Sequence, residues 1–393
     1  MSLYVQHGYG KGKMISEAIE ANLVKGIIIS PKDEKPENTT NLIKGIPSNI
    51  EVLFDPQFQA FMIEGRNDGR LSEYPYYVQK ISRLTLSDSE NIIKFVKDCI
   101  DYQTNLGLSS VISPTVTITD FRDMYSQKAL DFAIEASKHI GKDKLLIGLV
   151  VKESAFSARA DVDEYLRTLT EFDKARGFYL LIERANSDLE QHFNEEVLVN
   201  IMYFIFVLSK RADFEVIVGY SDYVGLLYHA VGAHATACGW HNSLKLLSSK
   251  RFMPSQGGRP KLPRYSCSPL LTHLVFPQHM RTFDDEGMLN DILSGTNYDE
   301  WFIGDKEPNP MIQCLTHWQA LGRIIDRIDS IEGTKKRLEF VLDRILGAKS
   351  ILNSFRAKIA DVDTILPIDF SYLDRWQESI RKLNELLSKG GQI

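Results

Sequence analysis

Eight short segments of this chain are apolar on both faces, and stretches with apolar residues every three or four positions separate them. Short continuous apolar runs are typical of buried parallel strands, whereas the 3.6-residue period is typical of amphipathic helices. The predicted strands are Leu3–Gln6, Gly26–Ser30, Glu51–Phe54, Ser109–Ile112, Lys144–Val151, Phe178–Ile182, Phe214–Val218 and His234–Cys238. This repeated strand–helix alternation predicts an α/β fold, a (β/α)8 TIM-like barrel, with an open doubly wound sheet as the alternative.

Helical patterns fill almost all of the gaps between these strands. The predicted helices of this part of the chain are Met14–Leu23, Ser89–Tyr102, Asp123–Ile140, Asp161–Lys174, Ser187–Lys210 and Tyr223–Val231. The connection between the third and fourth strands is much longer than the others, which is typical of a lid or binding loop. Its Tyr74, Tyr76 and Tyr77 either stack on a ring of a ligand or pin the connection to the barrel.

The composition changes after residue 283. Asp284–Glu307 holds eight acidic residues and one Lys among Gly and Pro, which indicates an irregular, exposed passage. Beyond it, apolar stripes at helical spacing predict two or three helices, the last at Tyr372–Leu387. The predicted organisation is a barrel over 1–283, an acidic irregular linker over 284–310 and a helical appendage over 311–393. The stripes either pack on the barrel and on each other or form an interface with a partner protein or a second copy.

Overall composition narrows the class of protein. Apolar residues make up 44% and charged residues 25% of the chain, which is ordinary for a globular protein. No run of about 18 apolar residues predicts a membrane span, and the N-terminus lacks the features of a signal peptide. The four cysteines are far apart and form no CxxC pair, so neither a disulfide framework nor a cysteine zinc site is expected. A cytoplasmic location without a membrane partner is the expectation.

A cationic window follows the last two predicted strands. From Tyr223 to Phe283 the chain has no Asp or Glu but seven Lys or Arg and five of the nine His, although the net charge is −6. The loops after these strands commonly hold a phosphate in (β/α)8 barrels. The predicted nucleic-acid or phosphate ligands are Lys250, Arg251, Arg259, Lys261 and Arg264. The alternative is that this basic loop docks on the acidic passage of the same chain.

Polar residues at the strand ends are the candidates for chemistry, because barrel active sites lie at the carboxyl ends of the strands. Those positions are His7, Asp55, Gln57, Ser113, Thr115, Lys152, Glu153, Glu183, Arg184, Asp222 and Trp240. Asp55 and Glu183 are predicted to face each other near Lys152 as the catalytic set, with acid and base roles divided between them. The predicted substrate-binding residues are Gln57, Ser113, Arg184, Asp222 and Trp240. In the alternative, Lys152 and Arg184 neutralise the two acids in a structural ion network.

Other motifs give no cofactor or metal site. HGYGKGK (His7–Lys13) lacks both the GxGxxG spacing and the GK[ST] ending of a P-loop. His229, His234 and His241 fall on a helix, a strand and a loop and form no compact ligand set, so no metal is expected. No GxSxG elbow exists, and Cys238 is interpreted as a small core residue.

Several segments resemble tRNA-guanine transglycosylases, a family that includes enzymes inserting deazaguanine bases into DNA. LLIGLVVKE (Leu145–Glu153) is similar to the family's strand LFGIVQGG. FDPQFQ (Phe54–Gln59) resembles the family's DSGGFQ, with Asp55 in place of its catalytic-site aspartate. VGYSDYVGLLYHAVGAHATAC (Val218–Cys238) resembles MGVGTPEDLLEAVARGVDMFDC. The resemblance implies a barrel that acts on nucleic acid.

The departures from the family pattern bear on activity. Ala237 precedes Cys238 where the family has its nucleophilic aspartate, and alanine cannot form the covalent glycosyl intermediate of base exchange. Val151, Lys152 and Glu153 stand where the family reads the base, and its CxCxxC zinc set is absent.

Two hypotheses remain open. One is an enzyme acting on nucleic acid or a nucleotide at an N-glycosidic or phosphoester bond, with the basic loop holding phosphates and with Asp55 and Glu183 as base or electrostatic stabiliser. The other is a catalytically inactive barrel that binds nucleic acid or protein within a multi-protein modification or defence assembly. Ala237 favours the second hypothesis, and the ionisable strand ends favour the first.

Overall fold

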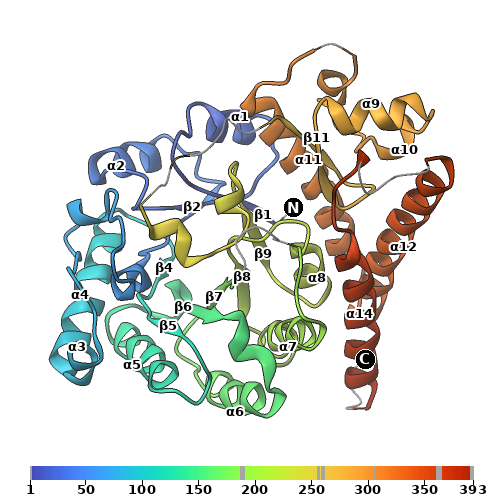
Figure 1. Cartoon of the computed structure of the whole chain (residues 1–393). Coiled ribbons are helices and arrows are strands. Elements are labelled where there is room, and N and C mark those ends of the chain that lie inside the picture. The colour runs from blue at the N-terminus through green and yellow to red at the C-terminus, as the bar shows by residue number, and fades with distance from the viewer. Residues whose placement is uncertain are drawn as a thin grey trace.

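The strands of this protein form a ring that helices surround (Figure 1). The computed structural model describes residues 2–185, 191–254, 257, 262–304, 306–359 and 365–389. The ring strands are β1 Leu3–Gln6, β2 Gly26–Ile29, β3 Glu51–Phe54, β4 Val111–Ile112, β5 Thr117–Ile118, β6 Leu145–Lys152, β7 Gly177–Glu183, β8 Glu215–Val218 and β9 Ala235–Cys238. Each predicted strand is confirmed to within two residues at either end. Almost every position in them is buried, as their apolar sequences require.

All of these strands are parallel, and they form a nearly closed eight-position barrel. The order is β3-β2-β1-β9-β8-β7-β6-β4, so the first and last strands along the chain, β1 and β9, pair directly. β4 and β5 count as one position because both pair with β6, at Leu145–Leu146 and at Val150–Val151. β3 lies against β4 across the remaining gap. The predicted barrel is therefore confirmed, because the contact of β3 with β4 brings together the two ends of the strand order, which an open sheet would leave apart.

The fourth position is split for an identifiable reason. Pro114 follows β4 and has no backbone N–H to donate to a ladder. The hydroxyl of Ser113 instead accepts a hydrogen bond from the backbone N–H of Gly148 at 3.0 Å. A Cβ at Gly148 would lie 2.5 Å from the Ser113 carbonyl oxygen, so only glycine allows this approach. Ser113, a predicted substrate ligand, thus uses its hydroxyl to bond the backbone of β6.

Helices cover the outside of the ring, as Figure 1 shows. They are α1 Met14–Glu20, α2 Pro36–Lys44, α3 Arg83–Ser87, α4 Ser89–Asn105, α5 Met124–His139, α6 Arg159–Thr170, α7 Glu195–Phe206 and α8 Gly225–Ala230. α2 was not predicted, and α7 begins later than the predicted Ser187. Asn194 sets that start, because its side chain accepts hydrogen bonds from the N–H groups of Glu196 and Val197.

The long connection after β3 is pinned to the barrel by its tyrosines. Tyr74 and Tyr76 are almost fully buried and pack around Phe54. The Tyr74 hydroxyl donates to the carbonyl of Glu34 at 3.0 Å and lies 2.9 Å from the hydroxyl of Thr39. For these two residues the pinning alternative is the one observed.

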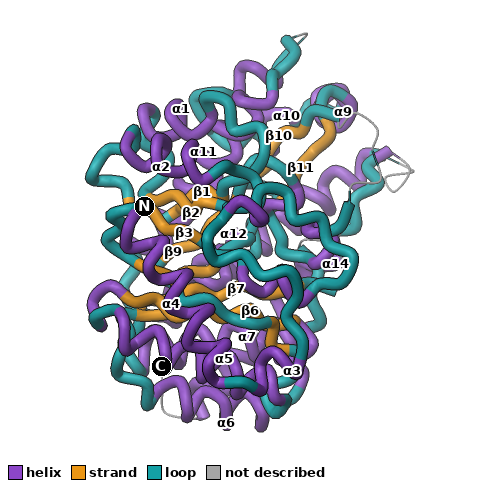
Figure 2. Tube along the Cα trace, turned by 90° about the vertical axis from the view of Figure 1, so that its left-hand side faces the viewer, coloured by secondary structure: helices purple, strands orange, loops and turns teal. Residues whose placement is uncertain are grey.

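The chain after β9 contains elements that the sequence did not predict. An antiparallel hairpin, β10 Arg264–Cys267 and β11 Thr272–Val275, stands apart from the ring strands (Figure 2). α9 Gln278–Asp285 and α10 Leu289–Ile292 follow it. The expectation of an exposed passage at 284–307 is wrong for Met288, Ile292, Asp299 and Phe302, which are all buried. Apolar and aromatic residues between the acids pack inward, and the acids themselves mostly remain at the surface.

The predicted C-terminal helices are confirmed as α11 Pro310–Asp329, α12 Thr334–Lys358 and α14 Ser371–Lys389. They lie along one side of the barrel against α7 and α8 (Figure 1). Their apolar stripes, including Trp318 and Trp376, are buried there, and burying such side chains stabilises by about 1.5–3 kcal/mol each. The stripes therefore pack on the barrel and on each other. None of the described helices is both long and apolar enough to span a membrane.

Candidate functional site

Four ionisable side chains meet at the rim of the barrel, and we call them the rim cluster: Asp222, Lys245, His273 and His317. They come from four separate elements. Asp222 lies in the loop that follows β8, and Lys245 lies in the loop that follows β9. His273 lies on β11 and His317 on α11. All four are buried, with Asp222 fully so.

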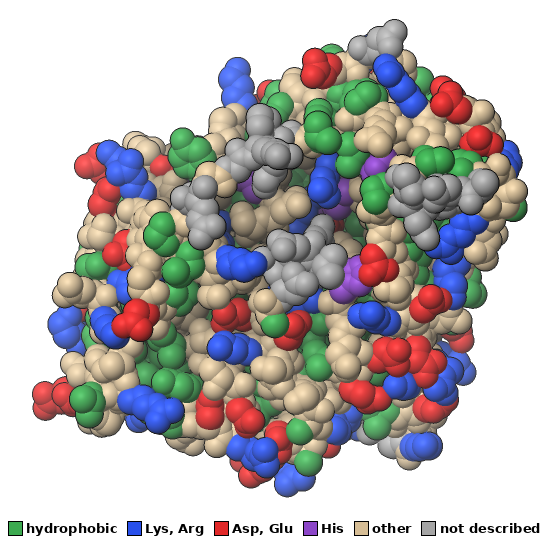
Figure 3. Space-filling view, in the orientation of Figure 1, with side chains coloured by type: hydrophobic (Ala, Val, Ile, Leu, Met, Phe, Trp, Pro, Cys, Tyr) green, Lys and Arg blue, Asp and Glu red, His purple; other side chains and the backbone are tan. Residues whose placement is uncertain are grey.

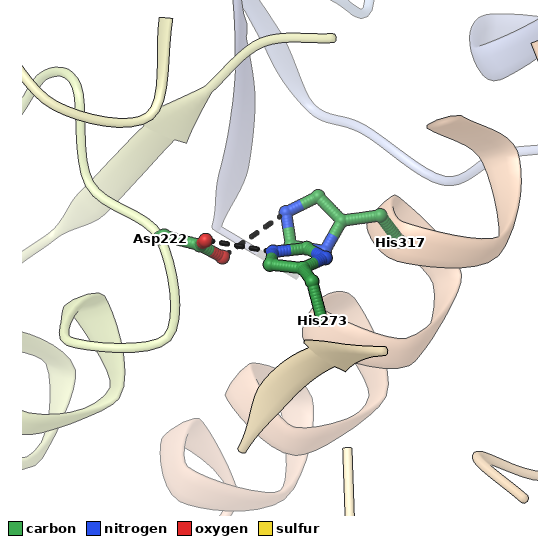
Figure 4. Close-up of side chains that lie close together, drawn as sticks. All are labelled: Asp222, His273 and His317. Carbon is green, nitrogen blue, oxygen red and sulfur yellow. Dashed lines mark hydrogen bonds and ion pairs between the residues drawn. The ribbon is translucent and has the colours of Figure 1, made fainter. Parts of the chain in front are cut away.

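Asp222 is at the centre of the rim cluster, and both imidazoles point at it (Figure 4). Its Oδ2 lies 2.8 Å from His273 Nε2, and its Oδ1 lies 3.3 Å from His317 Nε2. Oδ1 is buried and accepts no hydrogen bond from any residue that the structure describes. The Lys245 ammonium reaches the same His273 nitrogen, at 3.0 Å. Two rings, a carboxylate and an ammonium therefore share one small volume.

A hydrogen-bond chain fixes the ring of His317. Its Nδ1 lies 2.8 Å from the hydroxyl of Ser266, which lies 2.6 Å from the hydroxyl of Tyr223. Because Nδ1 is held this way, Nε2 faces Asp222. The thiol of Cys238 lies 3.5 Å from the same Nε2, and burial raises the pKa of that thiol. Cys238 is therefore a neutral thiol at neutral pH.

The electrostatics of the rim cluster follow from burial and from its one ammonium. Burial acts to raise the pKa of Asp222, but the adjacent His273 and Lys245 outweigh it and hold that pKa below its usual value. Burial, followed by the Lys245 ammonium, lowers the pKa of His317 well below its usual value. The Asp222 carboxylate is therefore ionised while the His317 imidazole is neutral.

A cavity of about 350 Å³, the rim cavity, opens onto this cluster. Trp240, Lys245, Arg264, His273, Gln313 and His317 contribute to its wall, and no carboxylate among the described residues lines it. Figure 3 shows Lys, Arg and His side chains bordering a hollow on this face of the molecule. Gly239 shapes one wall, because a Cβ there would lie 2.3 Å from the carbonyl oxygen of Gln6. The rim cavity is thus cationic, aromatic in part, and backed by a single buried carboxylate.

A second set of polar side chains lies further inside the barrel, and we call it the central network: Asp55, Gln57, Tyr179, Tyr220 and Arg251. Asp55 accepts hydrogen bonds from the Gln57 N–H at 3.0 Å and from the Tyr179 hydroxyl at 3.3 Å. The side-chain amide of Gln57 donates to the hydroxyls of Ser30, at 2.9 Å, and Tyr220, at 3.2 Å. Burial raises the pKa of Asp55 to about 6. These groups bond mainly to one another and to neighbouring side chains, although the buried Nε of Arg251 has no hydrogen-bond partner within the described chain. None of them lines the rim cavity.

Arg251 covers the central network and bonds to residues at its edge. Its guanidinium pairs with Asp33, donates to the hydroxyl of Ser30 at 3.1 Å and lies 5.7 Å from the ring centroid of Tyr220. Only 7% of its side chain is exposed, which does not fit the predicted role of Arg251 as a phosphate ligand. The segment Ser249–Phe252 that carries it is a short 3₁₀ turn.

The ends of β6 and β7 form a third, separate group. Arg184 is buried and pairs with Glu153, Nε to Oε2, at 2.6 Å. Glu183 is half-buried, and burial raises its pKa against the opposing charge of Lys152. No hydrogen bond or ion pair joins Glu183 to Asp55 within the described chain. The predicted catalytic set of Asp55, Glu183 and Lys152 is therefore not assembled by direct contact, and Arg184 pairs with Glu153 rather than with either of the two predicted acids.

The remaining predicted ligands are divided between the rim cavity and the surface. Trp240 lines the rim cavity, and its indole N–H donates to the carbonyl of Tyr9 at 2.8 Å. Arg264 is exposed at the cavity edge, and Lys250 is exposed on the loop before it. The predicted phosphate ligands Arg259 and Lys261 lie outside the described residues. No ion pair between the basic loop and the acidic passage occurs among the residues described.

Sequence reasoning identified Asp222 but missed His273 and His317. The two histidines are 44 positions apart, on a hairpin and a helix beyond the predicted ring, so no spacing motif connects them. One signal was present: each is a single His within an apolar segment, LLTHLVF (Leu271 and its neighbours) and CLTHWQAL (from Cys314). A polar ring buried on an apolar face requires a partner, although sequence alone does not say which.

No protein-family profile matches this chain, and no curated protein shows significant sequence similarity to it. The function must therefore be argued from the site itself.

Proposed function

We propose that this barrel binds a nucleotide or a short segment of nucleic acid in the rim cavity. The observation that supports it is the composition of the cavity wall, which combines Lys245, Arg264 and Trp240 and has no carboxylate from the part of the chain that the structure describes. A volume of about 350 Å³ is at the lower end of the range for small-molecule sites and suits one nucleotide unit.

Each part of a nucleotide has a matching group in this wall. The exposed Arg264 guanidinium offers the planar, two-pronged donor that phosphate oxygens accept, and Lys245 adds a second positive charge. Trp240 offers an aromatic face, and stacking of one base on such a ring contributes about 1–3 kcal/mol. The side-chain amide of Gln313 holds Arg264 in place at the cavity edge, since its Oε1 accepts from the Arg264 backbone N–H at 2.9 Å.

The resemblance to tRNA-guanine transglycosylases supports the same class of ligand, but not the chemistry of that family. Ala237 is fully buried on β9, and the adjacent Cys238 is a neutral thiol. Neither side chain can form the covalent glycosyl intermediate that base exchange needs. Binding is therefore the proposed function, and base exchange through the end of β9 is not part of it.

The test is a binding titration with the full chain. Fluorescently labelled single-stranded DNA and RNA are titrated by anisotropy, and nucleoside mono- and triphosphates by calorimetry, each at 50, 100 and 200 mM salt. We expect affinity to fall steeply with salt, because phosphate contacts release counterions. Trp240→Ala is expected to weaken binding about 5- to 150-fold. Arg264→Glu and Lys245→Met should weaken it as well.

Lys44→Glu is the matched control, since Lys44 is an exposed cation at the end of α2, outside the rim cavity. It should bind like the unaltered protein. Absence of binding to every oligonucleotide and nucleotide at 50 mM salt would overturn the proposal. Binding that is unchanged in Trp240→Ala, Arg264→Glu and Lys245→Met would overturn it too.

A further inference from the structure

Three of the rim-cluster residues carry the arrangement of a metal site. One donor atom each from Asp222, His273 and His317 lies within 4.8 Å of the other two. The residues come from a barrel loop, a hairpin strand and a C-terminal helix, yet their side chains converge on one point (Figure 4). Two imidazoles and one carboxylate form a mixed nitrogen and oxygen donor set, which suits first-row divalent transition metals better than Mg²⁺ or Ca²⁺.

Two distances in the cluster, each from a different oxygen of Asp222, are close to those between ligands of one ion. Asp222 Oδ2 lies 2.8 Å from His273 Nε2, and Asp222 Oδ1 lies 3.3 Å from His317 Nε2. Ligands placed about 2.1 Å from a common ion in tetrahedral or octahedral geometry are about 3.0–3.4 Å apart. Since all three donors lie within 4.8 Å of one another, local rotation of the side chains would bring them to a common ion.

Two further features favour an ion over a purely structural cluster. Asp222 Oδ1 is fully buried and accepts no hydrogen bond within the described chain, so this anionic oxygen lacks the donor that buried carboxylates normally have. The Nδ1 of His317 is held by Ser266 at 2.8 Å, as the outer nitrogen of a metal-bound histidine usually is. His273 and His317 also line the rim cavity, which leaves open coordination positions on that side.

We infer that Asp222, His273 and His317 bind one divalent transition-metal ion, of the zinc class, with its open coordination positions facing the rim cavity. This inference goes beyond the proposed function and does not rest on it. Open positions would allow the ion to take a water molecule or an oxygen of an anionic ligand.

The Lys245 ammonium competes with such an ion for His273. Its ammonium lies 3.0 Å from His273 Nε2, the nitrogen that the ion would use, and it lines the same cavity. Metal binding requires this ammonium to turn away into the cavity, since two positive charges at this distance repel. Lys245→Met should therefore tighten metal binding by at least about tenfold. The same substitution should weaken nucleotide binding, so the two proposals predict opposite effects and fail independently.

The experiment uses Zn²⁺ and Co²⁺ alone, without any nucleotide. The full chain is stripped with a chelator, and each metal is titrated in by calorimetry, while the visible absorption of Co²⁺ reports its ligands. We expect one ion per chain, and a Co²⁺ spectrum that shows nitrogen and oxygen ligands. His273→Gln and His317→Gln should each lower the affinity by more than the 10- to 100-fold that is typical for loss of an outer partner. Ser266→Ala should lower it by about 10- to 100-fold.

His234→Gln is the matched control, because His234 is exposed and outside the cluster. It should keep the affinity and the spectrum of the unaltered chain. Circular dichroism checks that each variant is folded, and Lys245→Met keeps the test decisive if a histidine variant fails to fold. Failure of both the unaltered chain and Lys245→Met to bind either metal would overturn the inference. So would a Co²⁺ spectrum that is unchanged in a folded His273→Gln or His317→Gln variant.

Discussion

The central network and the rim cluster lie in the same barrel, yet their polar groups are arranged in opposite ways. In the central network, Asp55 receives two hydrogen bonds, and Gln57 uses its amide on two hydroxyls. In the rim cluster, a carboxylate oxygen of Asp222 has no hydrogen bond, and two imidazoles converge on that carboxylate beside a cavity. In the first set both carboxylate oxygens of Asp55 are bonded, and among the described residues only the Nε of Arg251 lacks a partner. In the second set the unbonded atom is an anionic oxygen beside a cavity.

This difference in hydrogen bonding indicates which of the two sets of polar groups is the candidate ligand site. A buried network whose carboxylate is hydrogen-bonded by its neighbours rigidifies a core, and the cost of opening it is high. Where polar groups converge on a cavity and one of their atoms has no hydrogen bond, the arrangement suits a ligand that enters the cavity from solvent. Position at a strand end, the criterion available from sequence, is shared by both sets and cannot separate them.

The largest expected effect comes from neutralising Asp222. Asp222→Asn leaves the Lys245 ammonium buried without its balancing charge, so the free energy of unfolding should fall by about 3–5 kcal/mol in urea denaturation. Glu171→Gln, at an exposed carboxylate after α6, should change it little. Adding Lys245→Met to Asp222→Asn should recover part of the loss. A loss below about 1 kcal/mol would contradict the charge balance described for the rim cluster.

The next effect concerns the pH dependence of the central network. Burial raises the pKa of Asp55 from 3.8 to about 6, so the folded chain holds this proton more tightly than the unfolded chain. Its contribution to stability is therefore full below pH 4 and is lost as the pH rises through about 6, by about 3 kcal/mol in total. Asp55→Asn should remove this decline and be more stable than the unaltered chain at pH 7.

Urea denaturation of both proteins at pH 4, 5, 6 and 7 measures this difference. The comparison between the two proteins is needed because Glu34 and Glu51 have lowered pKa values and give slopes of the opposite sign. Parallel stability profiles for the two proteins would show that Asp55 titrates normally, and the central network would then not be a closed, dry site.

A smaller effect is expected at the closure of the central network. Arg251→Met removes the ion pair with Asp33, so the free energy of unfolding should fall by about 1.5–3 kcal/mol. Amide hydrogen exchange should also accelerate over Leu247–Phe252, which this side chain anchors. Lys44→Met, at an exposed cation at the end of α2, should leave both measurements nearly unchanged. Equal effects at the two positions would mean that Arg251 does not close the network.

The smallest expected effect is that of removing an exposed ion pair, and the effects at the buried clusters are compared with it. Lys97 pairs with Asp101 on the exposed face of α4, where both side chains are more than half exposed. Ion pairs of this kind contribute little, because solvent and salt screen them. Lys97→Ala should leave the thermal midpoint of unfolding unchanged within error. A clear shift would mean that exposed pairs matter in this protein, and the contrast with the buried clusters would weaken.

The ring was predictable because each strand carries its own signal. Segments such as Leu3–Gln6 and Glu51–Phe54 are apolar runs between helical patterns, and the structure has both with the predicted bounds. The β10–β11 hairpin was not predictable in the same way, since RYSC and THLV are short and have polar residues at positions that only the hairpin's own packing buries. The rim cluster was missed with it, because His273 comes from that hairpin and His317 from a helix.

Asp55 and Glu183 show what cannot be predicted from the position of a residue at the end of a strand. Both were correctly placed at the ends of β3 and β7. Their partners depend on side chains that arrive from elsewhere: the Tyr179 hydroxyl for Asp55, and Ser249 with Lys152 for Glu183. Sequence gives the direction of a strand, but it does not give which loop folds over the end of that strand.

The position of α11 along the chain sets the order in which this site can be built. A nascent polypeptide that has emerged as far as residue 245 has every strand of the ring, but of the rim cluster it has only Asp222 and Lys245, without either imidazole. The two rings arrive only with the hairpin and then with α11. A growing chain on the ribosome therefore could not bind the proposed ion at this place until translation has passed residue 317 and that helix has docked.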